Sequence, residues 1–179
     1  MHFKPFEFIK ALITNKFDKD IIVKEDATAI QPSITVDTKN LVKICQFLHD
    51  TPELYFDSLS CLTAIDNGVE ANSMEVIYHL YSIPHEYSLV LKVEVERNTE
   101  EGKLPQVPSV SSIWKTADWH EREAFDLVGI EFTNHPDLRR ILLPSDWEGY
   151  PLRKDYKEQE EYHGIKVKYA SAPNPTPNP

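Results

Sequence analysis

The feature that most constrains this fold is a pair of long alternating runs in the middle of the chain. Residues 73–82 and 87–95 alternate between side chains of two kinds, as half-buried β-strands do. The link between them, residues 83–86, contains Pro84 and is short enough for a hairpin. One side of the two runs is formed by Met74, Val76, Tyr78, Leu80, Leu89, Leu91, Val93 and Val95. The pattern therefore predicts an antiparallel hairpin with one buried face.

The remaining elements are indicated by apolar periodicity and by capping and turn residues. Asp37 or Thr38 can cap a helix that ends at Thr51-Pro52. Pro32 places its strand at a sheet edge or a bulge. The predicted helices are residues 5–15, 38–49 and 111–128, the other predicted strands are residues 20–24, 29–36 and 58–65, and residues 97–110 are predicted as a loop.

The expected fold class is α+β, a two-layer domain in the order α-β-β-α-β-β-β-α. Helices cover one face of a mixed sheet. This domain takes residues 1–130, and an extended arm follows over residues 131–170. The last nine residues, 171–179, contain four prolines and are predicted to be disordered.

Composition narrows the classes of partner. The net charge of −10 disfavours direct binding to nucleic acid or anionic lipid, because phosphate binding needs clustered Lys and Arg. Cys45 and Cys61 form no C-x-x-C motif, so this chain alone is not expected to hold an iron–sulfur or zinc site. Both are predicted to be buried in a reducing compartment. There is no secretory signal and no apolar run long enough to span a bilayer, so another chain would have to provide any membrane attachment.

A carboxylate lies on the apolar side of the helix predicted over residues 111–128. Glu121 falls between Trp114, Ala117, Phe125 and Val128 on a helical wheel. A buried carboxylate must be paired, hydrogen-bonded or protonated. We predict that one of the basic candidates pairs with it: Arg139, Arg140 or Arg153. The alternative is that the wheel drifts and Glu121 is exposed at a helix end.

His120 and Glu121 also raise the alternative of an acid–base site. The sequence offers no Ser or Cys nucleophile beside His120 and no glycine-rich phosphate loop. The second His of a helical zinc motif is missing, because position 124 is Ala. These absences disfavour catalysis by this chain alone.

Residues 131–170 are predicted to be an arm that a partner covers. The arm is irregular yet carries Trp147, Tyr150 and Tyr156 among its charged residues. Ordering a loop costs about 1–2 kcal/mol per residue in backbone entropy, so these large side chains must be buried somewhere. Trp, Tyr and Arg are typical anchors of interfaces. The alternative is an arm that wraps only its own domain.

The same region carries a family resemblance. The motifs are WHERE at 119–123, DLVGI at 126–130, HPDLRRIL at 135–142, DWEG at 146–149 and PLRKDY at 151–156. With them the chain resembles the C subunit of bacterial proton-pumping NADH:quinone oxidoreductase, respiratory complex I, whose mitochondrial counterpart is the iron–sulfur protein 3 subunit. Tyr150 departs from the pattern, where His is expected. The chain is similar to the free form of that protein, not to the fused C–D form.

The resemblance implies a structural role without a cofactor of its own. FMN, iron–sulfur clusters and quinone would be held by partner subunits. The chief partner would be the D subunit of complex I, with the B and I subunits nearby, at the cytoplasmic face of the cell inner membrane. The residues predicted to serve the partner interface or the structure are Glu121, Arg122, Glu123, Asp126, His135, Arg139, Arg140, Trp147, Arg153, Lys154, Asp155 and Tyr156.

Three alternatives stay open at this point. The first keeps the scaffold role but places it in a related membrane-bound hydrogenase, a formate-linked complex or a ferredoxin-dependent complex. The second is a free-standing enzyme that uses His120 and Glu121. The third is an acidic adaptor unrelated to respiration, which would leave the density of residues 119–156 unexplained.

Overall fold

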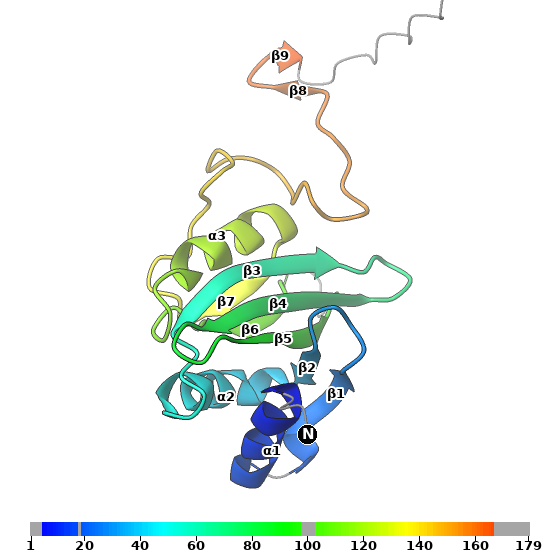
Figure 1. Cartoon of the computed structure of the whole chain (residues 1–179). Helices are drawn as coiled ribbons and strands as arrows, with labels where there is room; N and C mark the ends of the chain where they lie inside the picture. The colour runs from blue at the N-terminus through cyan, green and yellow to red at the C-terminus, as the bar shows by residue number, and fades with distance from the viewer. Residues whose placement is uncertain (1–4, 18, 98–102, 167–179) are drawn as a thin grey trace, which may run out of the picture.

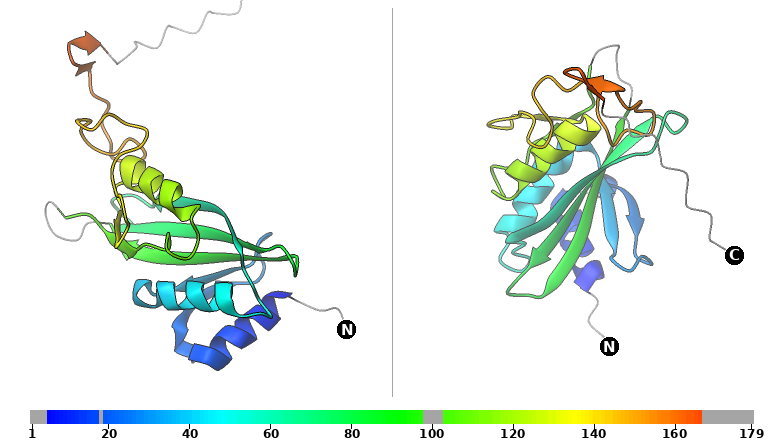
Figure 2. Two further views of the ribbon diagram at one scale, coloured as in Figure 1. Left: turned by 90° about the vertical axis from the view of Figure 1, so that its left-hand side faces the viewer. Right: turned by 90° about the horizontal axis from the view of Figure 1, so that it is seen from above.

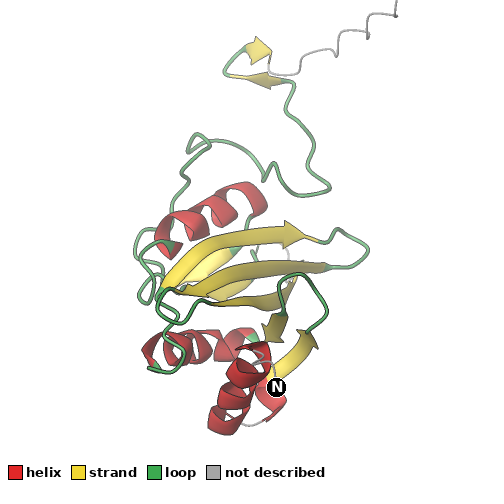
Figure 3. Cartoon of the chain, viewed as in Figure 1, coloured by secondary structure: helices red, strands yellow, loops and turns green. Residues whose placement is uncertain are grey.

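The computed structural model describes residues 5–17, 19–97 and 103–166 of the chain (Figure 1). Three α-helices and a mixed sheet form the body, and the arm leaves it after β7 (Figure 3). The helices are α1 (Pro5–Phe17), α2 (Thr38–Asp50) and α3 (Ala117–Val128), with a short 3-10 helix at Lys19–Ile21. The strands are β1 (Ile22–Asp26), β2 (Ser33–Val36), β3 (Ser58–Asp66), β4 (Ser73–Ser82), β5 (Tyr87–Glu96), β6 (Gln106–Pro108), β7 (Glu131–Thr133), β8 (Glu161–Tyr162) and β9 (Ile165–Lys166).

The main sheet has five strands in the order β1-β2-β5-β4-β3. The predicted hairpin is confirmed: β4 and β5 pair antiparallel in an unbroken register that sets Val76 opposite Val93. β2 pairs with β5 in parallel, so the sheet is mixed. β3 pairs only with β4 in this sheet and forms one of its edges.

One face of the sheet is buried under helices. Along β4, Met74, Val76, Tyr78 and Leu80 are buried, whereas the residues between them are partly exposed. Seen from above, α2 and α3 lie together on one side of the strands (Figure 2, right). The helices and the sheet share one apolar core. The α+β class and the helices on one face are confirmed.

Helices α1 and α2 begin at the predicted residues, Pro5 and Thr38. The Asp37 side chain caps α2 by accepting from the backbone N–H of Lys39, at 3.2 Å. Leu41, Ile44 and Leu48 of α2 are fully buried. Phe6, Ile9 and Ile13 of α1 are buried in the same core.

Several predicted boundaries are wrong. α3 begins at Ala117 and not at Ser111, because residues 111–116 form turns in which the N–H of Ile113 and Trp114 both donate to the Val110 carbonyl. The strand predicted over 29–36 is reduced to β2, which starts directly after Pro32. β6 lies inside the predicted loop, where it pairs in parallel with β7. Such three-residue strands leave no periodic pattern. The tail predicted to be disordered, 171–179, lies outside the described residues, and the domain division at residue 130 stays a prediction.

The prediction for the cysteines is half right. Cys45 is buried in α2, whereas Cys61 is exposed. The register of β3 shifts between Leu59 and Cys61, a bulge that leaves both Ser60 and Cys61 exposed on the edge strand.

Candidate functional site

The candidate site lies where the arm meets α3 and the end of the sheet. The part of the arm after β7 that the structure describes is residues 134–166. Asp126 of α3 provides the main anchor. Its Oδ2 accepts the backbone N–H groups of Ile141, Leu142 and Leu143 at 3.0, 2.7 and 2.8 Å. Its Oδ1 accepts Arg140 Nη1 at 2.7 Å. One buried carboxylate therefore fixes three consecutive peptide groups of the arm.

The environment of Asp126 favours its charged form. Burial alone would raise the pKa of this carboxyl, but the N–H groups of residues 141–143 and the Arg140 guanidinium outweigh it. The pKa of Asp126 therefore lies below its ordinary range. A buried carboxylate with these partners stays ionised at neutral pH and attracts Arg140.

Arg140 extends the anchor further along the arm. Its Nη2 donates to the carbonyls of Trp147 and Gly149 at 3.0 and 3.1 Å. Its guanidinium also lies 5.3 Å from the centre of the Tyr150 ring. Arg140 thus holds the turn at 147–150 against the C-terminal half of α3.

Arg153 also binds the end of α3. Its Nε donates to the Val128 carbonyl at 2.8 Å, and its Nη2 donates to the Gly129 carbonyl at 3.0 Å. Its guanidinium lies 4.8 Å from the centre of the Tyr150 ring. A cation at the C-terminus of a helix satisfies carbonyls that have no partner within the helix. Tyr150, the departure from the family pattern, therefore lies close to two guanidinium groups.

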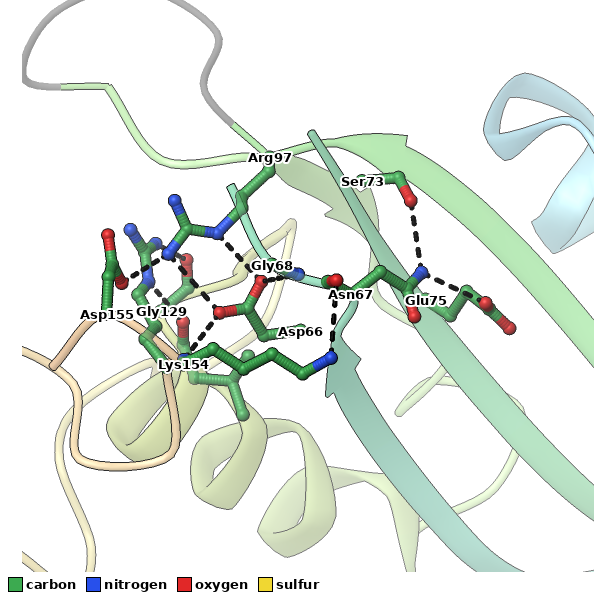
Figure 4. Close-up of polar contacts among 11 residues, drawn as sticks. Asp66, Asn67, Gly68, Ser73, Glu75, Arg97, Gly129, Lys154 and Asp155 are labelled. Carbon is green, nitrogen blue, oxygen red and sulfur yellow. Dashed lines mark hydrogen bonds and ion pairs between the residues drawn. The ribbon is translucent and has the colours of Figure 1, made fainter. Parts of the chain in front are cut away.

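A second anchor ties the arm to the ends of β3 and β5 (Figure 4). Arg97 is 2% exposed and binds Asp66 through Nε at 2.7 Å and Nη2 at 3.2 Å. Asp66 also accepts the backbone N–H of Lys154 at 2.8 Å, and Asp155 forms an ion pair with Arg97. Burial would raise the pKa of Asp66, but Arg97 and the N–H groups of Lys154 and Gly68 lower it below its ordinary range.

Asp66 and Arg97 are not among the site residues predicted from the sequence. The available signal was weak: Asp66 reads as a turn residue before Asn67-Gly68, and Arg97 reads as the polar end of a strand. Their pairing spans 31 residues of sequence, and its third member, Asp155, lies another 58 residues on. Only the hairpin and the return of the arm bring the three together.

The structure confirms that Glu121 is buried, but the predicted arginine partner is wrong. Glu121 Oε2 accepts Ser109 Oγ at 2.5 Å, and Oε1 accepts the Val110 N–H at 2.8 Å. These residues belong to the segment before α3, which lies beside Glu121 because β6 pairs with β7. Burial raises the pKa of Glu121 to about 7, although both hydrogen bonds oppose the shift.

His135 joins the arm to the N-terminal half of α3. Its side chain is fully buried, and Nε2 lies 3.1 Å from the Asp118 carbonyl and 3.8 Å from Glu121 Oε2. Nδ1 accepts the backbone N–H of Asp137 at 3.0 Å. Because a backbone N–H can only donate, Nδ1 is the acceptor in this contact, and Nε2 faces the Asp118 carbonyl.

The other predicted site residues divide between this network and the surface. Arg122 donates to the carbonyls of Arg139 and Arg140 at 3.2 and 3.3 Å. The Arg139 side chain is 72% exposed and pairs only locally, with Asp137. Glu123 is exposed, and Trp147 and Tyr156 are partly buried. Their role at a partner surface stays a prediction.

His120 and Glu121 do not form the acid–base pair of the enzyme alternative. His120 lines a shallow groove beside β3 with Cys61 and Leu152, whereas Glu121 points to Ser109 and Val110. Among the described residues, no group of three or more His, Cys, Asp or Glu side chains could hold a metal ion. Nor does any helix in the described ranges have the length and apolar character needed to cross a membrane.

The sequence that forms this site matches a known protein family. The family described as "Respiratory-chain NADH dehydrogenase, 30 Kd subunit" matches residues 34–162, from β2 to β8. The chain belongs to this family. The match includes α3 and both anchors of the arm, and it confirms the resemblance found in the sequence.

Individual relatives support the family membership. The C subunit of the NADH-quinone oxidoreductase of Chloroherpeton thalassium is 43% identical over 93% of this chain and 67% of its own length. The protein of the same name from Chlorobium phaeobacteroides is 42% identical over 88% of this chain and 92% of its own. A chain in the structure of the membrane-bound sulfane sulfur reductase, an archaeal respiratory membrane complex, has the same fold with a TM-score of 0.69, at 20% identity and 86% coverage of both chains.

Proposed function

We propose that this chain is a cofactor-free structural subunit of the hydrophilic arm of proton-translocating NADH:quinone oxidoreductase. In this role it holds the subunits that carry electrons from NADH to quinone in register. Family membership and the names of the relatives support the assignment to that complex. A structural role fits the way the charged groups of the site are used.

The observation that carries the proposal is the contrast between the charged and the apolar side chains of the site. Asp126, Arg140 and Arg153 are all bound within the chain. Large apolar side chains of α3 and the arm are left uncovered: Trp119 is 67% exposed, Leu142 62% and Leu152 60%. A preformed arm with unburied anchors is what a docking platform needs, because its ordering entropy is not lost again on binding.

The finer parts of the proposal rest on the resemblance to complex I. The D subunit of complex I is the chief partner, and the B and I subunits lie nearby. FMN, iron–sulfur clusters and quinone belong to partner subunits, and this chain binds none of them. The chain works at the cytoplasmic face of the inner membrane as a peripheral part of the complex. Its net charge of −10 favours contact with protein over direct contact with anionic lipid.

A second candidate keeps the scaffold and changes the reaction. The similar fold in the archaeal sulfane sulfur reductase complex shows that this architecture also occurs in another respiratory assembly. A membrane-bound hydrogenase or a ferredoxin-dependent complex is the corresponding alternative for this chain.

Purification of the chain from its native membranes in mild detergent tests the proposal. Mass spectrometry would identify the proteins that accompany it, and an assay would measure NADH:quinone reductase activity. Recovery of a D-type protein, of flavin and iron–sulfur subunits and of that activity is the expected result. A nickel hydrogenase or a ferredoxin-linked set of proteins would favour the second candidate. A chain that purifies alone would contradict both.

A further inference from the structure

The outer edge of β3 is unusual for an exposed sheet edge. Natural edge strands are blunted by charged residues, by proline or by a covering element, because free backbone groups otherwise pair with another chain. Residues 58–65 of β3 contain neither a charged residue nor a proline. Ser60, Cys61, Thr63 and Ile65 are exposed.

The register between β3 and β4 shows which backbone groups of β3 face outward. Asn67 N–H donates to the Ser73 carbonyl, so this opposed pair is hydrogen-bonded. Hydrogen-bonded pairs alternate along an antiparallel ladder, which makes 65–75 and 63–77 the next ones. The backbone N–H and C=O groups of Leu62 and Ala64 therefore point away from β4. Within the described part of the chain, no strand other than β4 pairs with β3.

A groove runs along this free edge. It has a volume of about 200 Å³, and α3 and the arm form its other wall. Its lining is mostly apolar and includes Cys61, Leu62, Ala64, Glu123, Leu127 and Leu152.

Contacts within the chain mark the two ends of the open stretch. Thr116 Oγ1 donates to the Leu59 carbonyl at 3.1 Å. At the other end, Lys154 N–H donates to the Asp66 side chain at 2.8 Å. The open stretch between them is residues 60–65, which matches a strand of about six residues at ~3.3 Å per residue.

Charge selects the occupant. Glu123 is the acidic side chain in the lining, it is exposed, and no described residue pairs with it. A second copy of this chain would bring another net charge of −10 and another Glu123 to the same edge. The chain's own last nine residues contain four prolines, which have no N–H for a ladder. A mostly apolar segment with one basic residue, from a different protein, fits the groove better than either.

We propose that the β3 edge receives an extended segment of a partner subunit, which adds to the sheet as a sixth strand. The segment bonds to the free peptide groups of Leu62 and Ala64. It places small or apolar side chains against Leu127 and Leu152 and a Lys or Arg beside Glu123. This is β-strand addition, in which main-chain hydrogen bonds supply affinity and side-chain contacts supply specificity. The inference rests on the proposed function, since it needs an assembly that contains this chain.

The two cysteines provide the test. The complex purified in mild detergent and the isolated chain are each treated with N-ethylmaleimide, and the modified peptides are measured by mass spectrometry. Cys61, in the groove, should be modified in the isolated chain and protected in the complex, whereas buried Cys45 should stay unmodified in both. Equal modification of Cys61 in both samples would overturn the inference.

A proline variant tests the backbone pairing directly. Ala64→Pro removes an outward N–H that β4 does not use, so the isolated chain should keep its unfolding midpoint while its recovery in the complex falls roughly tenfold. Val23→Pro is the matched control, since Val23 lies in the bulge of β1, the opposite edge strand, and this variant should assemble normally. Normal assembly of Ala64→Pro would contradict strand addition. If Ala64→Pro does not fold, the cysteine labelling alone decides.

The same purification separates the two proposals. If NADH:quinone oxidoreductase subunits accompany the chain while Cys61 remains reactive, the groove inference fails and the proposed function stands. If the chain purifies alone, the proposed function fails, and the occupant of the groove fails with it.

Discussion

At the scale of single residues, Glu121 shows how burial sets the charge of one carboxyl group. Its pKa is raised from 4.5 to about 7, and burial is the main cause. The folded state therefore holds the proton more tightly than the unfolded chain does. Stability from this group is fully present below about pH 4.5 and is lost as the pH rises to about 7. The loss corresponds to about 3 kcal/mol, at 1.36 kcal/mol per pKa unit.

The variant Glu121→Gln isolates this effect. Gln keeps the shape, can accept the Val110 N–H and can donate to Ser109, but it does not titrate. As the pH rises from about 4.5 to 7, the wild type should lose up to about 3 kcal/mol of unfolding free energy relative to the variant. Urea unfolding of both isolated chains across this range measures the difference. A difference that does not change with pH would show that Glu121 does not titrate in this window.

Periodicity could place Glu121 on the buried side of α3 but could not identify its partner. A helical wheel reports the angle of a side chain about its own helix, whereas the partner depends on which other segment lies there. Ser109 and Val110 lie beside Glu121 because two three-residue strands pair in parallel. Of the arginines expected in that place, Arg140 instead binds Asp126 and Arg153 binds carbonyls at the end of α3. Arg139 pairs with Asp137 at the surface.

At the scale of elements, the end of α3 and the arm fit each other closely at Gly129. Its φ is +76°, and its N–H donates to the carbonyls of Ala124 and Phe125 as a helix C-cap. A Cβ atom there would lie 2.7 Å from the Tyr150 ring and 2.8 Å from Arg153 Nη2. The helix therefore ends in a residue that leaves space for the arm.

Gly129→Ala should loosen the arm. A left-handed residue costs about 1–2 kcal/mol for Ala, and the new methyl group also displaces Tyr150. Gly164→Ala is the matched control: its φ is +77°, but nothing lies within 4 Å of the new Cβ atom. In limited proteolysis of the isolated chain, Gly129→Ala should be cut faster than the wild type at residues 140–153. Gly164→Ala should be cut there at the wild-type rate. Equal cleavage in the two variants would mean that close packing at Gly129 does not hold the arm.

The elements that sequence predicted best are those with long periodic patterns. The ten-residue strands β4 and β5 and the capped helix α2 are confirmed nearly to the residue. The arm was correctly predicted to be largely irregular, whereas its role as a set of interface anchors stays a prediction. Burial by a partner and wrapping on its own domain were the two alternatives for the arm. The structure shows that polar groups of the arm bind the chain's own body, whereas Leu142 and Leu152 are exposed.

At the scale of the whole molecule, anchors within the chain hold the arm against the body, and the proposed function makes this arm a platform for a partner. An arm without its anchors would have to be ordered during assembly, at about 1–2 kcal/mol per residue. Such a loss weakens association but does not remove a reacting group. The structural proposal therefore predicts a defect in assembly that is larger than the defect in turnover.

Arg140→Ala and Arg153→Ala should lower the amount of assembled complex more than its turnover per assembled particle. Removing Arg140 leaves Asp126 buried without its ionic partner, which costs about 3–5 kcal/mol in the isolated chain. Arg139→Ala should leave the stability of the isolated chain unchanged, because its side chain is 72% exposed, and should reduce assembly only through a lost partner contact. Native gels of detergent-solubilised membranes measure the amount of assembled complex, and NADH:quinone reductase activity divided by that amount gives the turnover per particle. Normal assembly with lost turnover would point instead to a direct part in the reaction, because a platform acts on the yield of complexes and not on the rate of each one.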